Sequence, residues 1–365
     1  MCSSDLWTVA SLKACIQYGA VSAKVHVLKR GLLQKADYAA LAQQKTVPDA
    51  CAYLKNETAY RSVLENVNEH TVHRTELERY IKAAYAHDAV KLVSFDNGKN
   101  KAFYQYIYVK TELDVIKNIL RSLANDEQPE YDIPPVLLRH FTVDVNRLLT
   151  SADIPEFLDN LAGSRYEAML APLVQQKEHQ NLFSIEMTLD MYYYQLVEKL
   201  RRALPGALDR KLLAETTGAE LDILNLFWIF RCKKYFDLPR ELVYSYLIPN
   251  HGRITRDEMV RLVEAPTVEA FIAEVRQTPY GKVFENYTGE FFHKKYAEYV
   301  YNLHQKFFRL YPYSVLAVVS YLHCKEIEIS NITTMIEGIR YGLAPEAILP
   351  YVVGLEENNG PAEQN

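Results

Sequence analysis

Glycine is scarce in this chain, which has 13 glycines in 365 residues, roughly half of the average usage of about 7%. Because glycine supplies tight turns and close backbone approach, its scarcity disfavours phosphate-binding loops and bulged sheets. The nucleotide-binding patterns GxxxxGK and GxGxxG do not occur. Long apolar runs are also missing, because the longest, 221–230 and 313–322, fall well short of the ~20 residues that cross a bilayer. The sequence therefore predicts no nucleotide-binding loop and no direct membrane span.

Cysteines are also few, and basic residues do not outnumber acidic ones. The cysteines are odd in number, form no CxxC pair and lie far apart, at Cys2, Cys15, Cys51, Cys232 and Cys324. This argues against a disulfide framework or a zinc ribbon and favours a reducing cytoplasm. The net charge is −5, whereas a protein that neutralises nucleic-acid phosphates is expected to be basic. The first 20 residues also lack the pattern of a signal peptide, so we expect a soluble, cytoplasmic protein that binds no nucleic acid.

What the chain does have is helical periodicity. Hydrophobic residues make up 49% and charged residues 24%, a mix typical of globular proteins, and the length predicts two or three domains. Between residues 182 and 200, apolar side chains recur at steps of three and four, which is typical of an amphipathic helix. The sequence therefore predicts an all-α fold. The spacing of a capping box predicts helix starts at Thr75…Glu78, Thr111…Asp114, Thr217…Glu220 and Thr255…Glu258.

An internal repeat is the strongest signal in the sequence. One pattern is a pair of acids separated by an apolar residue and followed by an asparagine. Its copies are Glu112/Asp114 with Asn118, Glu220/Asp222 with Asn225, and Glu326/Glu328 with Asn331. The asparagines are 107 and 106 residues apart, and the apolar residues around each lie on one helical face. This spacing indicates a unit of about 107 residues.

A second pattern alternates strictly with the first. It is Ser/Thr-x-Tyr followed by two apolar residues, and its tyrosines are Tyr60, Tyr166 and Tyr280. We interpret the chain as three similar helical domains, because two interleaved patterns at one period would rarely recur in triplicate by chance. The predicted division is a 1–15 N-terminal extension, domains at 16–128, 129–237 and 238–353, and a disordered tail at 354–365.

The candidate chemical groups favour structural roles. The two acids of each pair point about 200° apart on a helix, so we expect them to stabilise a helix N-terminus and not to bind a metal ion. The asparagines are expected to bond a loop or neighbouring backbone, with partner contact as the alternative. His70 and His73 have helical spacing but no HExxH pattern, and His323-Cys324 has no visible Asp partner. The sequence thus predicts no catalytic, cofactor-binding or metal-binding residues.

Clusters of tyrosine and of basic residues leave two interpretations open. Clusters such as 192–194 and 296–301 suit either core packing with a hydrated hydroxyl or an aromatic interface. Basic stretches at 199–202 and 231–234 suit solvated helix ends, or contact with acidic surfaces of a partner.

Three stretches carry a resemblance to a known family. They are Tyr18-Gly19 with Ala23-Lys24 and Leu32-Leu33, Tyr53-Leu54-Lys55 to Tyr60, and Asn331-Ile332 to Glu337-Gly338-Ile339-Arg340-Tyr341-Gly342-Leu343. Together they resemble the C subunit of V-type ATPases, the bacterial and archaeal counterpart of the eukaryotic d subunit, over about Tyr18 to Val353. Two departures stand out. Residues 1–15 match nothing in the family, and Ser22, Lys24 and His26 stand where Asn, Arg and Arg are expected.

The resemblance implies a non-catalytic, funnel-shaped rotor subunit whose three domains surround a pseudo-threefold axis. Such a protein would be one copy in a hetero-oligomeric complex at the cytoplasmic face of the membrane. Its implied partners are the rotor axle subunits, of D and F type, and the proteolipid c-ring, with no cofactor of its own. The alternative is a free-standing helical repeat scaffold that binds another protein. An enzyme is disfavoured, because no nucleophile, base and orienting group can be named together.

Overall fold

The computed structural model describes residues 3–96, 98, 100–127, 135–175, 182–236, 238–249, 252–285 and 292–355. Within these ranges the chain forms helices and turns and no strand, which confirms the all-α prediction. The predicted disordered tail lies outside the described residues, apart from Gly354 and Leu355. A long first helix, α1 (Ser3–Arg30), contains the predicted boundary at residue 15, so the helix runs unbroken through it.

The helices after α1 repeat one order: short helices and then two long ones. The first set is α2 (Lys35–Ala42), α3 (Val47–Glu57), α4 (Arg61–Leu64), α5 (Arg74–Phe95) and α6 (Gln105–Ala124). The second is α7 (Pro135–Leu138), α8 (Val145–Leu149), α9 (Ile154–Asn160), α10 (Glu167–Gln175), α11 (Leu182–Arg202) and α12 (Ala207–Arg231), which ends in the π-helical turn η2 (Cys232–Phe236). The third is α13 (Arg240–Tyr246), α14 (Arg256–Glu264), α15 (Val268–Val275), the 3-10 turn η3 (Gly281–Phe284), α16 (Phe292–Leu310) and α17 (Val315–Arg340). Two short turns, α18 (Pro345–Ile348) and η4 (Leu349–Tyr351), complete the described elements.

The same cap begins one short helix in each set. The side chains of Thr46, Asp153 and Thr267 accept hydrogen bonds from backbone N–H groups three residues later, at 3.2, 2.8 and 3.1 Å. Each bond satisfies a helical N–H group that has no carbonyl partner in the first turn. This device starts α3, α9 and α15 at equivalent places.

Three of the four predicted capping boxes are wrong. Only Thr255 caps a helix, at the start of α14, with Glu258 returning the bond to its backbone. Thr75, Thr111 and Thr217 lie inside α5, α6 and α12. The hydroxyl of Thr111 donates to the carbonyl of Ile107 one turn earlier, at 3.1 Å. The pattern fails because it also occurs inside helices, where the threonine bonds back along its own helix.

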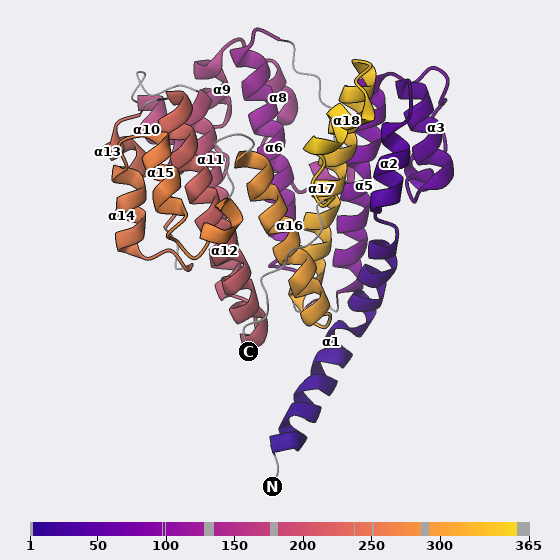
Figure 1. The fold of residues 1–365 in the computed structure, drawn as a ribbon, viewed down its shortest axis with the longest axis horizontal. Coiled ribbons are helices and arrows are strands. Elements are labelled where there is room, and N and C mark those ends of the chain that lie inside the picture. The colour runs from indigo at the N-terminus through magenta and orange to yellow at the C-terminus, as the bar shows by residue number, and fades with distance from the viewer. Residues whose placement is uncertain are drawn as a thin grey trace. The chain divides into compact units, whose positions relative to one another are not determined.

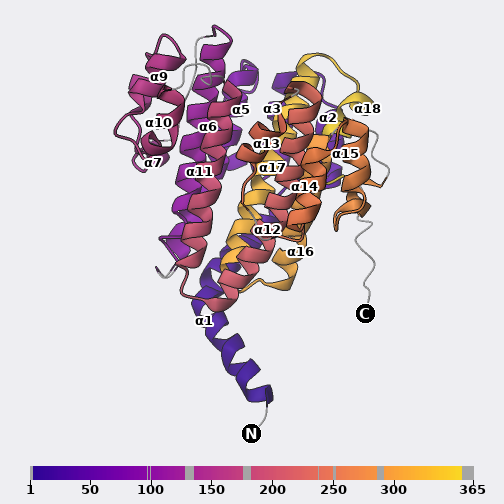
Figure 2. The same ribbon diagram turned by 90° about the vertical axis from the view of Figure 1, so that its left-hand side faces the viewer.

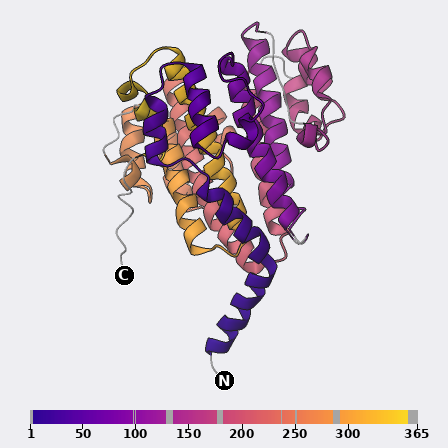
Figure 3. The same ribbon diagram turned by 90° about the vertical axis from the view of Figure 1, so that its right-hand side faces the viewer.

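The contacts divide the chain into two compact units. The first contains residues 1–98, 215–227 and 252–365. In this unit α17 packs against α16, α5, α1 and α3. Figure 1 shows α17 between α16 and α5, and Figure 3 shows the molecule from the side on which α2 and α3 lie. Its core joins residues from both ends of the chain, because Leu41 and Leu54 of the first set lie in one cluster with Ile332 and Ile336 of α17.

The second unit contains residues 99–214 and 228–251. Its centre is the pair of long helices α6 and α11, which run beside each other in Figure 2. Helices α8 and α9 pack on α6, and α10 packs on α11. The short helices α8 and α9 of the second set therefore lie against the last long helix of the first set. The division into three domains at 16–128, 129–237 and 238–353 stays a prediction.

Candidate functional site

The three repeated tyrosines each donate a hydrogen bond to a buried carboxylate on a long helix. Tyr60 bonds to Glu328 of α17 at 2.8 Å. Tyr166 bonds to Glu112 of α6 at 2.6 Å, and Tyr280 bonds to Asp222 of α12 at 2.7 Å. We call these three pairs, Tyr60–Glu328, Tyr166–Glu112 and Tyr280–Asp222, the tyrosine–carboxylate nodes. Each node joins the short helices of one set to the last long helix of another.

The sequence Ser/Thr-x-Tyr builds the tyrosine half of each node locally. In every copy the hydroxyl of the Ser or Thr accepts a hydrogen bond from the tyrosine's own N–H, with a distance of 3.2 Å for each of Thr58, Ser164 and Thr278. A hydroxyl that bonds the backbone two residues ahead makes a compact turn. This turn follows α3, α9 or α15 and points the ring toward the long helix.

Each carboxylate also accepts backbone N–H groups from the segment that precedes α2, α8 or α14. Glu328 accepts from Leu33, and Glu112 accepts from Val143 at 3.0 Å. Asp222 accepts from Arg253 at 2.6 Å and from Ile254 at 3.1 Å. One carboxylate therefore holds both ends of a short-helix motif, the loop that begins it and the tyrosine that ends it.

The node carboxylates are almost fully buried, with exposed fractions of 1% for Glu112, 1% for Asp222 and 2% for Glu328. A buried charge is costly unless it is paired and hydrogen-bonded. At Glu328 the partner is Lys325, whose Nζ lies 2.7 Å from Oε1, and at Glu112 it is Arg165, at 3.7 Å. Hydrogen bonds to the charged form, together with these bases, allow the carboxylates to remain inside.

The node tyrosines are held in their neutral form. Burial, followed by the nearby negative charge of Glu328, raises the pKa of the Tyr60 hydroxyl well above its usual value. Burial and the neighbouring carboxylate raise the pKa of Tyr166 and of Tyr280 in the same way. A neutral hydroxyl is the form that can donate to a carboxylate, so the environment keeps each node intact at neutral pH.

The expectation that the paired acids cap helix N-termini is wrong. Glu112, Asp222 and Glu328 lie in the middle of α6, α12 and α17, far from the first turns. Each carboxylate instead accepts hydrogen bonds from a short-helix motif that packs against its helix. The first acid of the pair serves in α6 and the second in α12 and α17, because the node requires only the acid that faces the core.

The three asparagines are not equivalent in the structure. Asn225 and Asn331 are buried, three residues after a node carboxylate, whereas Val115 takes that place in α6 and Asn118 is exposed. Asn331 bonds both backbone groups of Val353, donating to its carbonyl at 3.0 Å and accepting from its N–H at 2.9 Å. For Asn331 the predicted contact with neighbouring backbone is therefore found, and it ties the segment after η4 to α17.

The other sequence candidates lie apart from the nodes. His70 and His73 are exposed, and no cluster of His, Cys, Asp or Glu among the described residues has the geometry of a metal site. Cys324 is buried, and burial raises its pKa to about 12, so its thiol is not activated.

A buried histidine escaped the sequence analysis. The Nε2 of His304 lies 2.8 Å from Glu220 and its Nδ1 lies 3.1 Å from the hydroxyl of Ser320. Its ring stacks on His323 with a centroid distance of 4.4 Å. The signal was weak, because these residues come from three different helices and share no local spacing.

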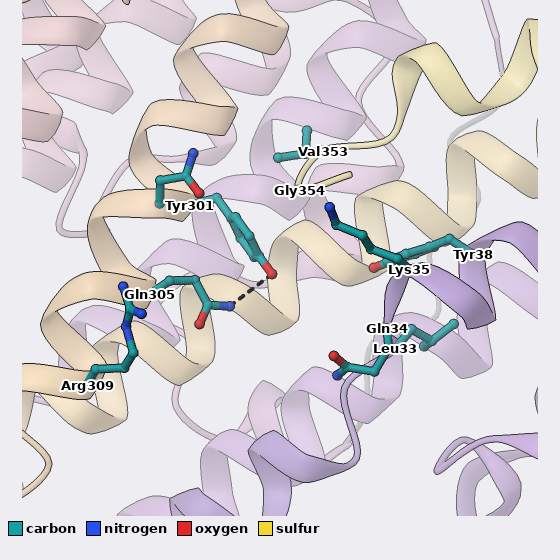
Figure 4. A pocket seen from close by; sticks show the side chains of 10 residues that line it. Leu33, Gln34, Lys35, Tyr38, Tyr301, Gln305, Arg309, Val353 and Gly354 are labelled. Carbon is teal, nitrogen blue, oxygen red and sulfur yellow. Dashed lines mark hydrogen bonds between the residues drawn. The ribbon is translucent and has the colours of Figure 1, made fainter. Parts of the chain in front are cut away.

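A polar cavity of about 290 Å³ lies between α2, α16 and the segment at Val353. Figure 4 shows Lys35 and Tyr38 on one side and Tyr301, Gln305 and Arg309 on the other. Gln305 donates to the Tyr301 hydroxyl at 2.9 Å across its wall. These side chains offer hydrogen bonds and positive charge, but no nucleophile or base in a catalytic arrangement.

The fold and the nodes define an all-helical, internally repeated structural protein. None of the described helices is long and apolar enough to span a membrane. A family model described as ATP synthase (C/AC39) subunit matches residues 21–351. The chain belongs to this family. As a member, it is a structural subunit of an ATP synthase complex and is not an enzyme by itself.

Curated relatives agree with the family model. The chain is 25% identical to the A-type ATP synthase C subunit of Thermococcus kodakarensis over 344 residues, which cover 92% of this chain and 90% of the relative. It is 21% identical to that of Methanosphaera stadtmanae, with 89% and 85% covered, and 23% identical to that of Methanosarcina mazei, with 93% and 94% covered. The similarity thus extends over nearly the whole length of each compared pair.

Proposed function

We propose that this chain is the central-stalk subunit that couples the rotor axle to the membrane ring of a V/A-type ATPase. In this role one copy lies on the cytoplasmic side of the proteolipid c-ring and receives the axle subunits of D and F type. It passes torque between them during ATP-driven ion transport or ATP synthesis. The observation that carries the proposal is the family match over residues 21–351, together with relatives named as the C subunit of A-type ATP synthase.

The order of the nodes supports a closed, pseudo-threefold arrangement of the repeats. The second set bonds to the first through Tyr166–Glu112, and the third bonds to the second through Tyr280–Asp222. The first set bonds to the third through Tyr60–Glu328. This order is cyclic. In an open stack of three repeats, the tyrosine at one end and the acid at the other end would have no hydrogen-bond partner in another set. A closed set around an axis is the arrangement expected of a funnel that accepts an axle.

The nodes also suit a body that carries torque. Each fixes a motif at two points through hydrogen bonds to a buried charge, which are about twice as strong as neutral ones. Such bonds are shielded from water and salt by burial. A subunit that transmits rotation must be rigid. Hydrogen bonds between sets that end on buried carboxylates resist the separation of those sets.

Co-purification tests the proposal directly. The tagged chain is mixed with axle subunits and detergent-solubilised proteolipid ring from the same organism, and the complex is isolated by size. A stoichiometric complex with one copy of the chain per ring and axle is expected. Detergent micelles without the ring serve as the control. Binding to neither the axle nor the ring would refute the coupling role and favour a free-standing helical scaffold.

A further inference from the structure

The end of α12 is rich in basic and aromatic residues. The ten residues 231–240 carry four bases and one acid, within a protein whose net charge is −5. Two large aromatic side chains there face solvent, with exposed fractions of 64% for Tyr235 and 41% for Phe236. We call Arg231, Lys233, Lys234, Tyr235 and Phe236 the aromatic–basic patch.

The backbone of the patch is a π-helical turn. Residues Cys232–Phe236 form η2, and the N–H of Leu238 reaches the carbonyl of Cys232 at 3.3 Å. A π turn is rare and occurs frequently at functional sites. Here the wider turn brings bases and aromatic rings to the same exposed helix end.

Aromatic contacts with neighbouring helices hold the patch in place. Phe236 packs on Phe183 with a centroid distance of 4.5 Å, and Phe183 packs edge-on against Tyr246 at 5.4 Å. Arg231 lies over Phe236 at 5.9 Å, and Lys234 lies over Tyr235 at 5.4 Å. The bases are therefore held beside the rings, so positive charge and apolar surface are presented together.

We propose that the aromatic–basic patch binds the headgroup region of an anionic lipid bilayer. Tyrosine rings prefer the boundary between headgroups and acyl chains, and lysines reach past apolar surface to anionic headgroups. The patch is an exposed helix end. It lines neither the cavity between α2 and α16 nor a second cavity beside Lys45, His73 and Arg340. A projecting group of this kind matches a planar, deformable surface better than a shaped protein pocket. This contact is additional to the proposed binding of axle and ring.

Vesicle flotation of the full-length chain tests the contact. Vesicles of phosphatidylcholine with phosphatidylglycerol are compared with vesicles of phosphatidylcholine alone, at low and high salt. Binding to the anionic vesicles is expected, with loss at high salt. Lys233→Gln and Lys234→Gln are each expected to weaken it about fivefold, since a base near an anionic surface contributes about that factor.

A matched control separates the patch from general surface properties. Tyr341 is exposed to the same degree as Tyr235, at 65%, and also lies beside a base, Arg340, with 4.9 Å between the guanidinium and the ring centre. Tyr235→Ala is expected to weaken vesicle binding, whereas Tyr341→Ala leaves it unchanged. Both positions are on the surface, so thermal unfolding should be the same for both variants.

Two results would overturn the lipid contact. One is absence of binding to anionic vesicles at low salt. The other is equal loss of binding in the Tyr235→Ala and Tyr341→Ala variants. A third result combines two observations: the patch variants no longer co-purify with the axle or the ring, and the unaltered chain does not bind vesicles. In that case the patch recognises an acidic protein surface and the lipid proposal is wrong.

Discussion

The buried ion pair between Lys325 and Glu328 gives a sharp test of how the nodes stabilise the protein. The two charged groups are 2.7 Å apart, and their side chains are 6% and 2% exposed. The Lys325 ammonium also lies 4.1 Å from the centre of the Tyr60 ring. Lys325→Met removes the positive charge and leaves Glu328 with the hydrogen bonds from Leu33 and Tyr60. Breaking a buried pair in this way costs about 3–5 kcal/mol, a large part of the ~5–15 kcal/mol that stabilises a typical protein.

A double-mutant cycle distinguishes the lost pair from lost packing. Glu328→Gln removes the matching negative charge, so the double variant has no unpaired buried charge at this node. We therefore expect the Lys325→Met, Glu328→Gln double variant to be about 1–3 kcal/mol more stable than the sum of the single effects. The measurement is urea unfolding at neutral pH, followed by helical circular dichroism, with the slope compared among all four proteins.

A second lysine–glutamate contact in the same unit provides the control. Lys294 lies 3.2 Å from Glu298 of α16, but Lys295 lies 3.5 Å from the same carboxylate and compensates. Lys294→Met should therefore cost less than about 1 kcal/mol. Equal losses for Lys325→Met and Lys294→Met, or strict additivity in the cycle, would refute the view that the node depends on a buried, paired charge.

Further predictions concern the other nodes and the buried thiols. Tyr166→Phe removes a hydrogen bond to a buried charge and should cost about 1.5–3 kcal/mol in urea unfolding. Gly252→Ala should also destabilise, because a Cβ at Gly252 would lie 2.2 Å from a carboxylate oxygen of Asp222. The node tyrosines stay protonated in the folded chain but ionise near pH ~10 when unfolded. Their contribution to stability should therefore be constant below that pH and fall above it, by about 1.4 kcal/mol per pH unit for each tyrosine. In mass-spectrometric alkylation, exposed Cys15 should react in the native protein and Cys324 only after unfolding.

The repeat could be found in the sequence because its tyrosine half is local. The Ser/Thr-x-Tyr turn closes within three residues, so its spacing is the same wherever it occurs. The repeated caps were missed, although their signal was present: Thr46 and Asp153 are each followed two residues later by a proline, at Pro48 and Pro155. A cap followed closely by proline predicts a helix start more reliably than the hydroxyl-to-acid spacing alone.

The carboxylate half could not be assigned from the sequence. Tyr166 bonds to an acid 54 residues earlier, and Tyr60 bonds to one 268 residues later. Such partners are chosen by tertiary packing, and no local spacing specifies them. Which acid of a pair accepts the tyrosine depends on which one the long helix turns toward the core. The node acid is therefore the first of the pair in α6, Glu112, and the second of the pair in α12, Asp222.

The pairing of Tyr60 with Glu328 has a consequence for how the fold is completed. The other two nodes join neighbouring sets along the sequence, so each can form once the intervening segment exists. The Tyr60–Glu328 node joins the first set to the last long helix, and its core cluster likewise combines Leu41 and Leu54 with Ile332. The first short-helix motif therefore obtains its carboxylate, its paired lysine and much of its core only from α17. Because such distant contacts carry the largest loop-closure cost, this node depends most on the whole chain being present.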